Sequence, residues 1–152
     1  MDTQLFKTAP EFEIVSSRIF EVNKALLFSA FSNMDVLKKW WGPEGFTNTF
    51  NEFDFREGGR WRFIMHGPEN GNYQNEVEFV KIKVPDLIAW KRISKPLFNV
   101  VFTFSELGER QTELIFRMIF DNENECNKIK KFAVDKNEEN FDRLEYEIKK
   151  LI

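Results

Sequence analysis

Residues 54–68 constrain the fold of this chain more than any other segment. They contain Gly58-Gly59, and glycines can adopt the positive φ angles that a tight turn requires. After this pair, Trp61, Phe63 and Met65 recur at every second position, which places their side chains on one face of a strand. The segment therefore predicts a β-hairpin whose second strand has one dry face.

Turn signals, including the one at Gly58-Gly59, recur between residues 46 and 120 at intervals typical of an antiparallel meander. They lie at residues 57–59, 67–72, 84–86, 95–96 and 107–109. About six strands are expected in this region. Another strand is expected over Glu13–Phe20, which is rich in β-branched residues.

Two short helices are expected between the first strand and the meander. Asn23 is the predicted N-cap of the first helix. Ser32, followed three residues later by Asp35, resembles a capping box and is the predicted start of the second helix. Gly42-Pro43 should end that helix, because proline disfavours the helical conformation of the residue before it.

The C-terminal region predicts an amphipathic helix. Phe141, Leu144, Ile148 and Leu151 are spaced three, four and three residues apart, which makes one apolar stripe. Such a helix must bury its stripe against the apolar face of the sheet, so the predicted fold class is α+β. The length fits a single domain over residues 1–152, in which residues 1–12 are expected to be a loose lead-in.

Composition narrows the possible functions. The chain has 152 residues, of which 18 are Phe, 4 are Trp and 2 are Tyr. This content implies either a packed aromatic core or a lined apolar cavity, and the sequence leaves both open. The net charge of −3 offers no basic surface for nucleic acid. A single His and a single Cys make most metal sites and catalytic triads impossible, so no metal, cofactor or catalytic residue is expected. A metal site built only from carboxylates stays open over residues 121–125, where the start of a helix is favoured.

The start of the chain lacks the pattern of a secretory signal, and no apolar run approaches the length of a membrane span. We therefore expect a soluble cytoplasmic protein, either a monomer or a homodimer.

Four motifs occur together in one order. They are residues 27–31 with 36–43, residues 54–63, residues 65–68 and residues 85–88. Trp40-Trp41 with Gly42-Pro43, followed by the pattern Asp-x-Arg-x-Gly-Gly-x-Trp over residues 54–61, is a more specific signal than either part alone. With these motifs, residues 13–152 resemble the family related to the activator of Hsp90 ATPase, within the Bet v 1-like or START-like helix-grip superfamily.

The resemblance implies a curved antiparallel sheet of six or seven strands around the long C-terminal helix. It also implies an apolar cavity between sheet and helix, with the two short helices closing one end. The predicted lining of this cavity is Trp40, Trp41, Trp61, Phe63, Met65, Phe79, Trp90, Phe102, Phe104, Leu114, Phe116, Met118, Phe141, Leu144 and Ile148.

Three functions stay open, because one fold serves many roles. The favoured hypothesis is a small soluble protein that binds an apolar or aromatic molecule, lipid-like or polyketide-like, without covalent chemistry. The second is an interaction domain that regulates an Hsp90-type chaperone. The third is a cyclase-like or hydrolase-like enzyme in which His66 or Glu78 moves a proton. For His66 a structural role is favoured, and for Glu76 and Glu78 cross-strand ion pairs with Arg60 and Arg62.

Overall fold

The computed structural model describes residues 5–152. Its elements in chain order are η1 (Pro10–Phe12), β1 (Glu13–Phe20), α1 (Lys24–Ser32), α2 (Met34–Trp40), β2 (Thr47–Phe53), β3 (Arg60–His66), β4 (Asn72–Lys83), β5 (Leu87–Arg92), β6 (Asn99–Gly108), β7 (Gln111–Ile119) and α3 (Glu123–Leu151). The strands form one antiparallel sheet in the order β1-β7-β6-β5-β4-β3-β2. No helix within residues 5–152 is long and apolar enough to span a membrane.

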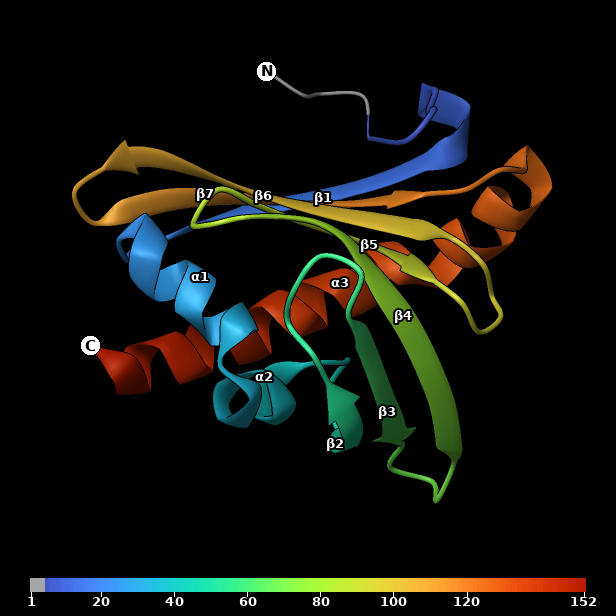
Figure 1. Cartoon of the computed structure of the whole chain (residues 1–152), viewed down its shortest axis with the longest axis horizontal. Coiled ribbons are helices and arrows are strands. Elements are labelled where there is room, and N and C mark those ends of the chain that lie inside the picture. Colours follow the sequence, from blue (N-terminus) through green and yellow to red (C-terminus); the bar gives the residue numbers. More distant parts are fainter. Residues whose placement is uncertain (1–4) are drawn as a thin grey trace.

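The sheet curves over α3, and α1 and α2 lie together beside that helix (Figure 1). Six strands form the expected meander, and β1 is added at one edge of the sheet, where it pairs along its whole length with β7. The predicted α+β helix-grip fold is therefore confirmed. The inner face of the sheet and α3 enclose the main core, as the alternation in β3 and the stripe on α3 predicted.

The N-cap of α1 agrees with the prediction, whereas the N-cap of α2 differs from it. Asn23 Oδ1 accepts a hydrogen bond from the backbone N–H of Leu26 at 2.8 Å, so the predicted first cap is confirmed. The second cap is Asn33, whose Oδ1 accepts from the N–H of Asp35 at 3.0 Å. The predicted capping box at Ser32 is wrong, because Ser32 is the last residue of α1.

The Gly58-Gly59 turn joins β2 to β3 and also contacts β4. Gly58 has a φ of +84°, and its N–H donates to the carbonyl of Phe79 at 2.8 Å. A Cβ on Gly59 would lie 2.1 Å from the backbone oxygen of Asp54. Both glycines are therefore required by the backbone, one for its dihedral angle and one for a close approach.

Residues 5–12 differ from the predicted loose lead-in. Leu5 and Phe6 pack against a small apolar cluster of Ala89, Val101 and Ile119 on the outer face of the sheet. The central strands are apolar on both faces there, so the outer face needs a cover of its own. Residues 1–4 of the predicted lead-in lie outside the described residues.

The aromatic residues form a continuous packed core. Trp61 is fully buried and stacks on Phe63 with ring centroids 4.1 Å apart. It also meets Trp41 and Trp90 edge to face, each at 5.5 Å. A second group of rings lies beneath α1, where Phe31 contacts Trp40, Phe102 and Phe104. Most of the space between sheet and helices is thus filled by rings.

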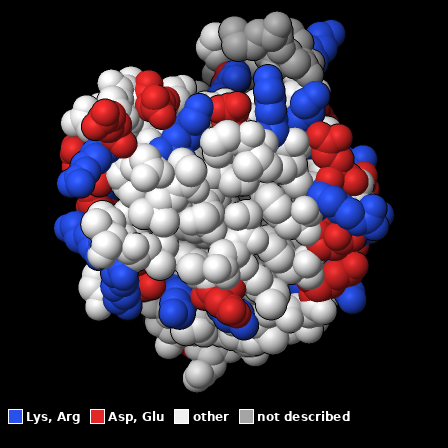
Figure 2. Space-filling model, turned by 60° about the vertical axis from the view of Figure 1, so that its left-hand side comes forward, with Lys and Arg blue, Asp and Glu red and all other residues white. Residues whose placement is uncertain are grey.

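One side of the molecule has few charges at its centre. α1 carries no charged residue after Lys24, and its outward positions include Ala25, Leu26 and Ser29. Figure 2 brings this side of Figure 1 forward and shows a broad uncharged surface surrounded by charged side chains. We call it the α1 face.

Candidate ligand-binding cavity

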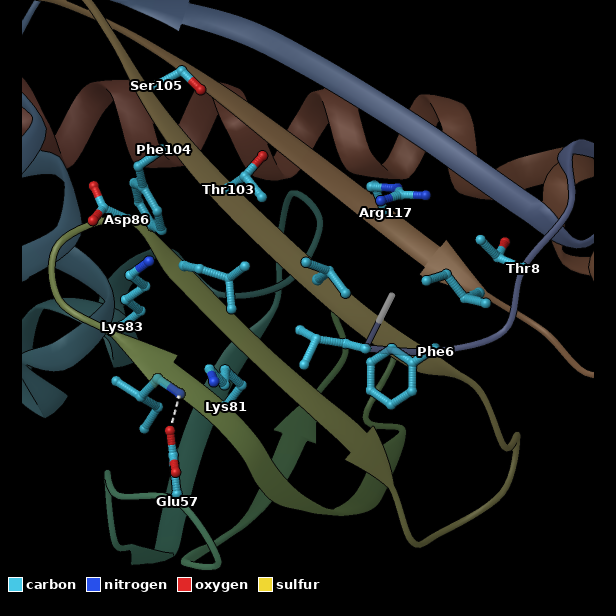
Figure 3. A pocket seen from close by; sticks show the side chains of 15 residues that line it. Phe6, Thr8, Glu57, Lys81, Lys83, Asp86, Thr103, Phe104, Ser105 and Arg117 are labelled. Atoms are coloured by element: carbon cyan, nitrogen blue, oxygen red, sulfur yellow. Dashed lines mark hydrogen bonds between the residues drawn. The ribbon is translucent and has the colours of Figure 1, made fainter. Parts of the chain in front are cut away.

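The structure has a hollow on each face of the sheet, and the larger one lies on the outer face. It has a volume of about 630 Å³ and is lined by strands β4 to β7 and by the N-terminal segment (Figure 3). Several of its charged groups are already engaged. Asp86 pairs with Lys24, Arg117 pairs with Glu13, and Glu57 accepts a hydrogen bond from the N–H of Ile82.

The inner cavity lies between the sheet and α3, where the sequence predicts a site. It has a volume of about 180 Å³. Strands β3 to β7, the segment after α2 and one face of α3 provide its lining, which comprises Trp41, Gly42, Pro43, Phe63, Met65, Val77, Trp90, Arg92, Phe98, Val100, Phe116, Met118, Lys136, Asn137 and Asn140.

Six of the fifteen predicted lining residues lie at this cavity. They are Trp41, Phe63, Met65, Trp90, Phe116 and Met118. The other nine are buried in the packed core and do not line it, namely Trp40, Trp61, Phe79, Phe102, Phe104, Leu114, Phe141, Leu144 and Ile148. The reason is that aromatic rings fill the interior beneath α1, and only the end of the sheet beside the middle of α3 stays open. Sequence alternation identifies the inward face but cannot locate a gap along it.

Four polar residues at the cavity were not predicted from the sequence: Arg92, Lys136, Asn137 and Asn140. A signal for three of them exists. Arg92 is two residues after Trp90 on the same strand, so it shares the inward face. The stripe of α3 continues towards its N-terminus through Asn140 and Asn137 at helical spacing. The predicted stripe consists of apolar residues alone, so it does not include these amides.

Asn140 is a lining residue that carries a buried polar atom without a partner. The residue is only 6% exposed, and Oδ1 is buried without a hydrogen-bond partner in residues 5–152. A buried acceptor without a partner costs about 1–3 kcal/mol. The neighbouring amide differs, because Asn137 Nδ2 donates to Ser16 Oγ at 3.3 Å and approaches Met118 Sδ at 3.6 Å.

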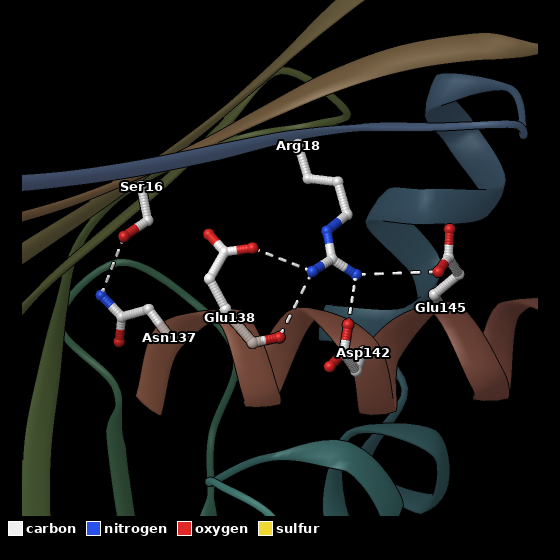
Figure 4. A network of polar contacts seen from close by, with 6 residues as sticks. All are labelled: Ser16, Arg18, Asn137, Glu138, Asp142 and Glu145. Atoms are coloured by element: carbon white, nitrogen blue, oxygen red, sulfur yellow. Dashed lines mark hydrogen bonds and ion pairs between the residues drawn. The ribbon is translucent and has the colours of Figure 1, made fainter. Parts of the chain in front are cut away.

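The position of these amides depends on how α3 is attached to β1 (Figure 4). Arg18 reaches from β1 to three acids along α3, with distances of 2.9 Å to Glu138, 2.8 Å to Asp142 and 3.7 Å to Glu145. Burial lowers the pKa of Arg18, but the hydrogen bonds to Glu138 and Asp142 outweigh it and leave the pKa raised. Arg18 therefore stays charged, and its ion pairs hold the face of α3 that carries Asn137 towards the sheet.

A second arginine fixes the rim that carries Trp41. Arg143 Nη1 donates to the carbonyls of Trp41, Gly42 and Pro43 at 3.0 to 3.3 Å, and Nη2 donates to the carbonyl of Lys39 at 2.8 Å. Burial lowers the pKa of Arg143. These hydrogen bonds fix the position of the Trp41 ring at the cavity, because the segment after α2 is not part of a strand that the sheet would hold in place.

The two residues considered as proton carriers lie elsewhere. His66 Nε2 is 2.8 Å from Thr49 Oγ1, and its Nδ1 is 2.6 Å from Asn72 Oδ1. Glu78 is 3.5 Å from Arg60, which also pairs with Glu76 at 2.7 Å. Neither His66 nor Glu78 lines the inner cavity.

The remaining charge pattern agrees with cross-strand pairing. The predicted pairs of Arg60 with Glu76 and Glu78 are present. The predicted partner of Arg62 is wrong, because Arg62 pairs at 3.0 Å with Glu52 on β2, on the other side of β3. Within residues 5–152, no three His, Cys, Asp or Glu side chains come together in a group that could hold a metal ion.

Solved structures with this fold come from several bacteria. Protein NE0264 from Nitrosomonas europaea has a TM-score of 0.87 at 17% identity, covering 93% of this chain and 97% of that protein. A protein from Rhodobacter sphaeroides has a TM-score of 0.85 at 16% identity, covering 96% and 98%. The AHSA1 protein from Silicibacter pomeroyi has a TM-score of 0.75 at 19% identity, covering 92% and 99%. At these identities the likeness shows the fold alone.

No curated protein matches the chain in sequence. The family model described as activator of Hsp90 ATPase homolog 1-like protein matches residues 21–149, which include α1, every strand from β2 to β7 and nearly all of α3. The chain therefore belongs to the activator of Hsp90 ATPase homolog 1-like family.

Proposed function

We propose that the protein binds a small aromatic or apolar molecule in the inner cavity, without covalent chemistry. The observation that carries the proposal is the buried, unpartnered Oδ1 of Asn140 at a cavity otherwise walled by rings and methionines. A ligand hydroxyl or N–H would supply the missing hydrogen bond. Ligand sites commonly combine an apolar wall with a few placed polar groups of this kind.

The volume limits the size of the ligand. A dry cavity of about 150 Å³ accommodates benzene, whereas sites for drug-sized ligands span about 300–1,000 Å³. The inner cavity, at about 180 Å³, fits a single ring with one or two substituents. A larger lipid-like or polyketide-like ligand would need Met65 and Met118 to move, which their flexible side chains allow.

Two neighbouring valines on β6 distinguish the inner cavity from the outer hollow. Val100 lines the inner cavity, whereas Val101 lines the outer hollow, and both are nearly fully buried. Val100→Phe should lower the affinity for phenol, measured by titration calorimetry, by about tenfold or more because the new ring occupies the site. Val101→Phe should leave the affinity for phenol unchanged.

Both variants insert the same extra volume, which costs about 1–3 kcal/mol of stability in a packed region. Thermal melts therefore have to show that each variant is folded at the temperature of the titration. If Val101→Phe weakened binding and Val100→Phe did not, the site would be the outer hollow. If phenol did not bind the unmodified protein, the proposal would be wrong.

A second candidate function is interaction with an Hsp90-type chaperone. It is supported by the family to which the chain belongs and by the uncharged α1 face, which is of the kind that protein partners cover. Stimulation of a purified Hsp90 ATPase by the protein would favour this candidate. Replacing Ala25 with Glu on the α1 face should then abolish the stimulation without changing the affinity for phenol.

The enzymatic alternative has less support than either candidate. His66 and Glu78 are both held in contacts away from the inner cavity. The cytoplasmic location and the choice between monomer and homodimer stay predictions from the sequence.

A further inference from the structure

The cationic side chains at the inner cavity have no negative counterpart in its wall. Arg92 and Lys136 both line the cavity, and no Asp or Glu is among the lining residues. Lys136 lies 3.7 Å from Glu139 on the same helix. Arg92 forms no ion pair with a carboxylate of residues 5–152. The uncompensated charge of the wall is therefore that of Arg92.

Neutral groups hold the Arg92 side chain in place. Its Nε donates to the carbonyl of Pro96 at 2.8 Å, and its Nη2 donates to Asn75 Oδ1 at 2.8 Å and to Ser94 Oγ at 3.2 Å. The guanidinium also lies over the ring of Phe98, 5.3 Å from the centroid. No hydrogen bond joins Nη1 to any residue in the described part of the chain. Two N–H donors thus stay available on a side chain whose orientation is fixed.

Burial also affects the protonation of this group. It lowers the pKa of Arg92 to about 10, and no neighbouring carboxylate counteracts the shift. At neutral pH the guanidinium is still charged, because this pKa lies well above 7. A charge that is partly removed from water and has no ionic partner gains more from an incoming anion than an exposed charge does.

We propose that the ligand of the inner cavity is an aromatic or short apolar acid, whose carboxylate pairs with Arg92 Nη1 while its body lies among the rings. This inference rests on the proposed binding function and specifies the class of ligand. The carboxylate accepts hydrogen bonds from the free N–H groups of Arg92, and a hydroxyl elsewhere on the ligand donates to Asn140 Oδ1. A hydroxylated single-ring acid satisfies both groups and fits the volume.

Benzoate and benzamide form a matched pair of probes, because they have nearly the same shape and differ in charge. Titration calorimetry in a buffer free of carboxylates and phosphate should give about tenfold or more tighter binding of benzoate to the unmodified protein. Arg92→Gln should remove this preference and leave the affinity for benzamide nearly unchanged. Arg92→Lys should keep part of the preference, since it keeps the charge but not the planar fork.

The control is Lys91→Gln, which removes one positive charge from the neighbouring, exposed residue of β5. It should keep the preference for benzoate. Equal affinities of the unmodified protein for the two probes, or a preference that survives in Arg92→Gln, would overturn the inference and leave the proposed function standing. If neither probe bound, the inference would be overturned, and the phenol titration would decide separately whether the proposed function stands. Thermal melts establish that each variant is folded, and a failure of Arg92→Gln to fold would leave Arg92→Lys and the unmodified protein as the test.

Discussion

Trp61→Ala should lower the free energy of unfolding by about 3–5 kcal/mol, because it removes the largest side chain at the centre of the packed aromatic core. Trp61 is fully buried and contacts rings from the segment after α2 and from strands β2, β3 and β5. Its loss leaves a cavity that these rigid rings cannot collapse to fill. Urea unfolding followed by circular dichroism measures the change.

Trp61→Phe is the matched variant and should cost much less. The indole Nε1 of Trp61 is buried without a hydrogen-bond partner in residues 5–152, so removing it offsets part of the lost apolar area. If Trp61→Phe lowered the free energy of unfolding as much as Trp61→Ala, Nε1 would have a hydrogen-bond partner, such as a buried water. A change below about 1 kcal/mol for Trp61→Ala would contradict the packed core itself.

Asn140→Leu should change stability and binding in opposite directions. Leucine has a similar volume and no polar atom, so the variant removes a buried acceptor that has no partner and should raise the free energy of unfolding by about 1 kcal/mol. The same change removes the acceptor for a ligand hydroxyl. The affinity for phenol should therefore fall by about tenfold and become similar to the affinity for toluene. The affinity for toluene should be the same in the variant and in the unmodified protein.

The control for this prediction is Asn137→Leu, one turn earlier on the same face of α3. Asn137 has a partner, Ser16, so its replacement should lower the free energy of unfolding instead of raising it. A loss of stability in Asn140→Leu would show that Asn140 is satisfied without a ligand. Equal affinities of the unmodified protein for phenol and toluene would show that Oδ1 does not contact the ligand.

The sequence predicted the elements well because their signals are local. Period-two alternation, the turns at glycine and proline, and the stripe on α3 each depend on a few neighbouring residues. The cap of α2 was misplaced by one residue because Ser32 and Asn33 can both cap a helix, and the choice depends on how far α1 extends. The packing of Leu5 and Phe6 was missed because it depends on an apolar outer face built by β5, β6 and β7.

The site was less predictable than the fold. The alternation of β3 places Trp61 and Phe63 on the same face, yet only Phe63 lines the inner cavity. Whether an inward side chain meets a ring or a gap depends on contacts between distant elements, such as Trp41 after α2 against Trp61 on β3. To predict the polar lining, one must know both the register of β5 in the sheet and the orientation of α3 about its axis, because Arg92 comes from β5 and Asn140 from α3. These long-range relations are set by packing and leave no local pattern.

The central claim is that a small ring-containing molecule occupies the inner cavity, and the methionine methyl groups test it most directly. Met65 and Met118 line the cavity, whereas Met34 is exposed on α2 and serves as an internal control. In protein labelled with ¹³C at the methionine methyls, added phenol should shift the signals of Met65 and Met118 in a saturable manner and leave Met34 unchanged. Unchanged signals for Met65 and Met118 at saturating phenol would contradict the claim.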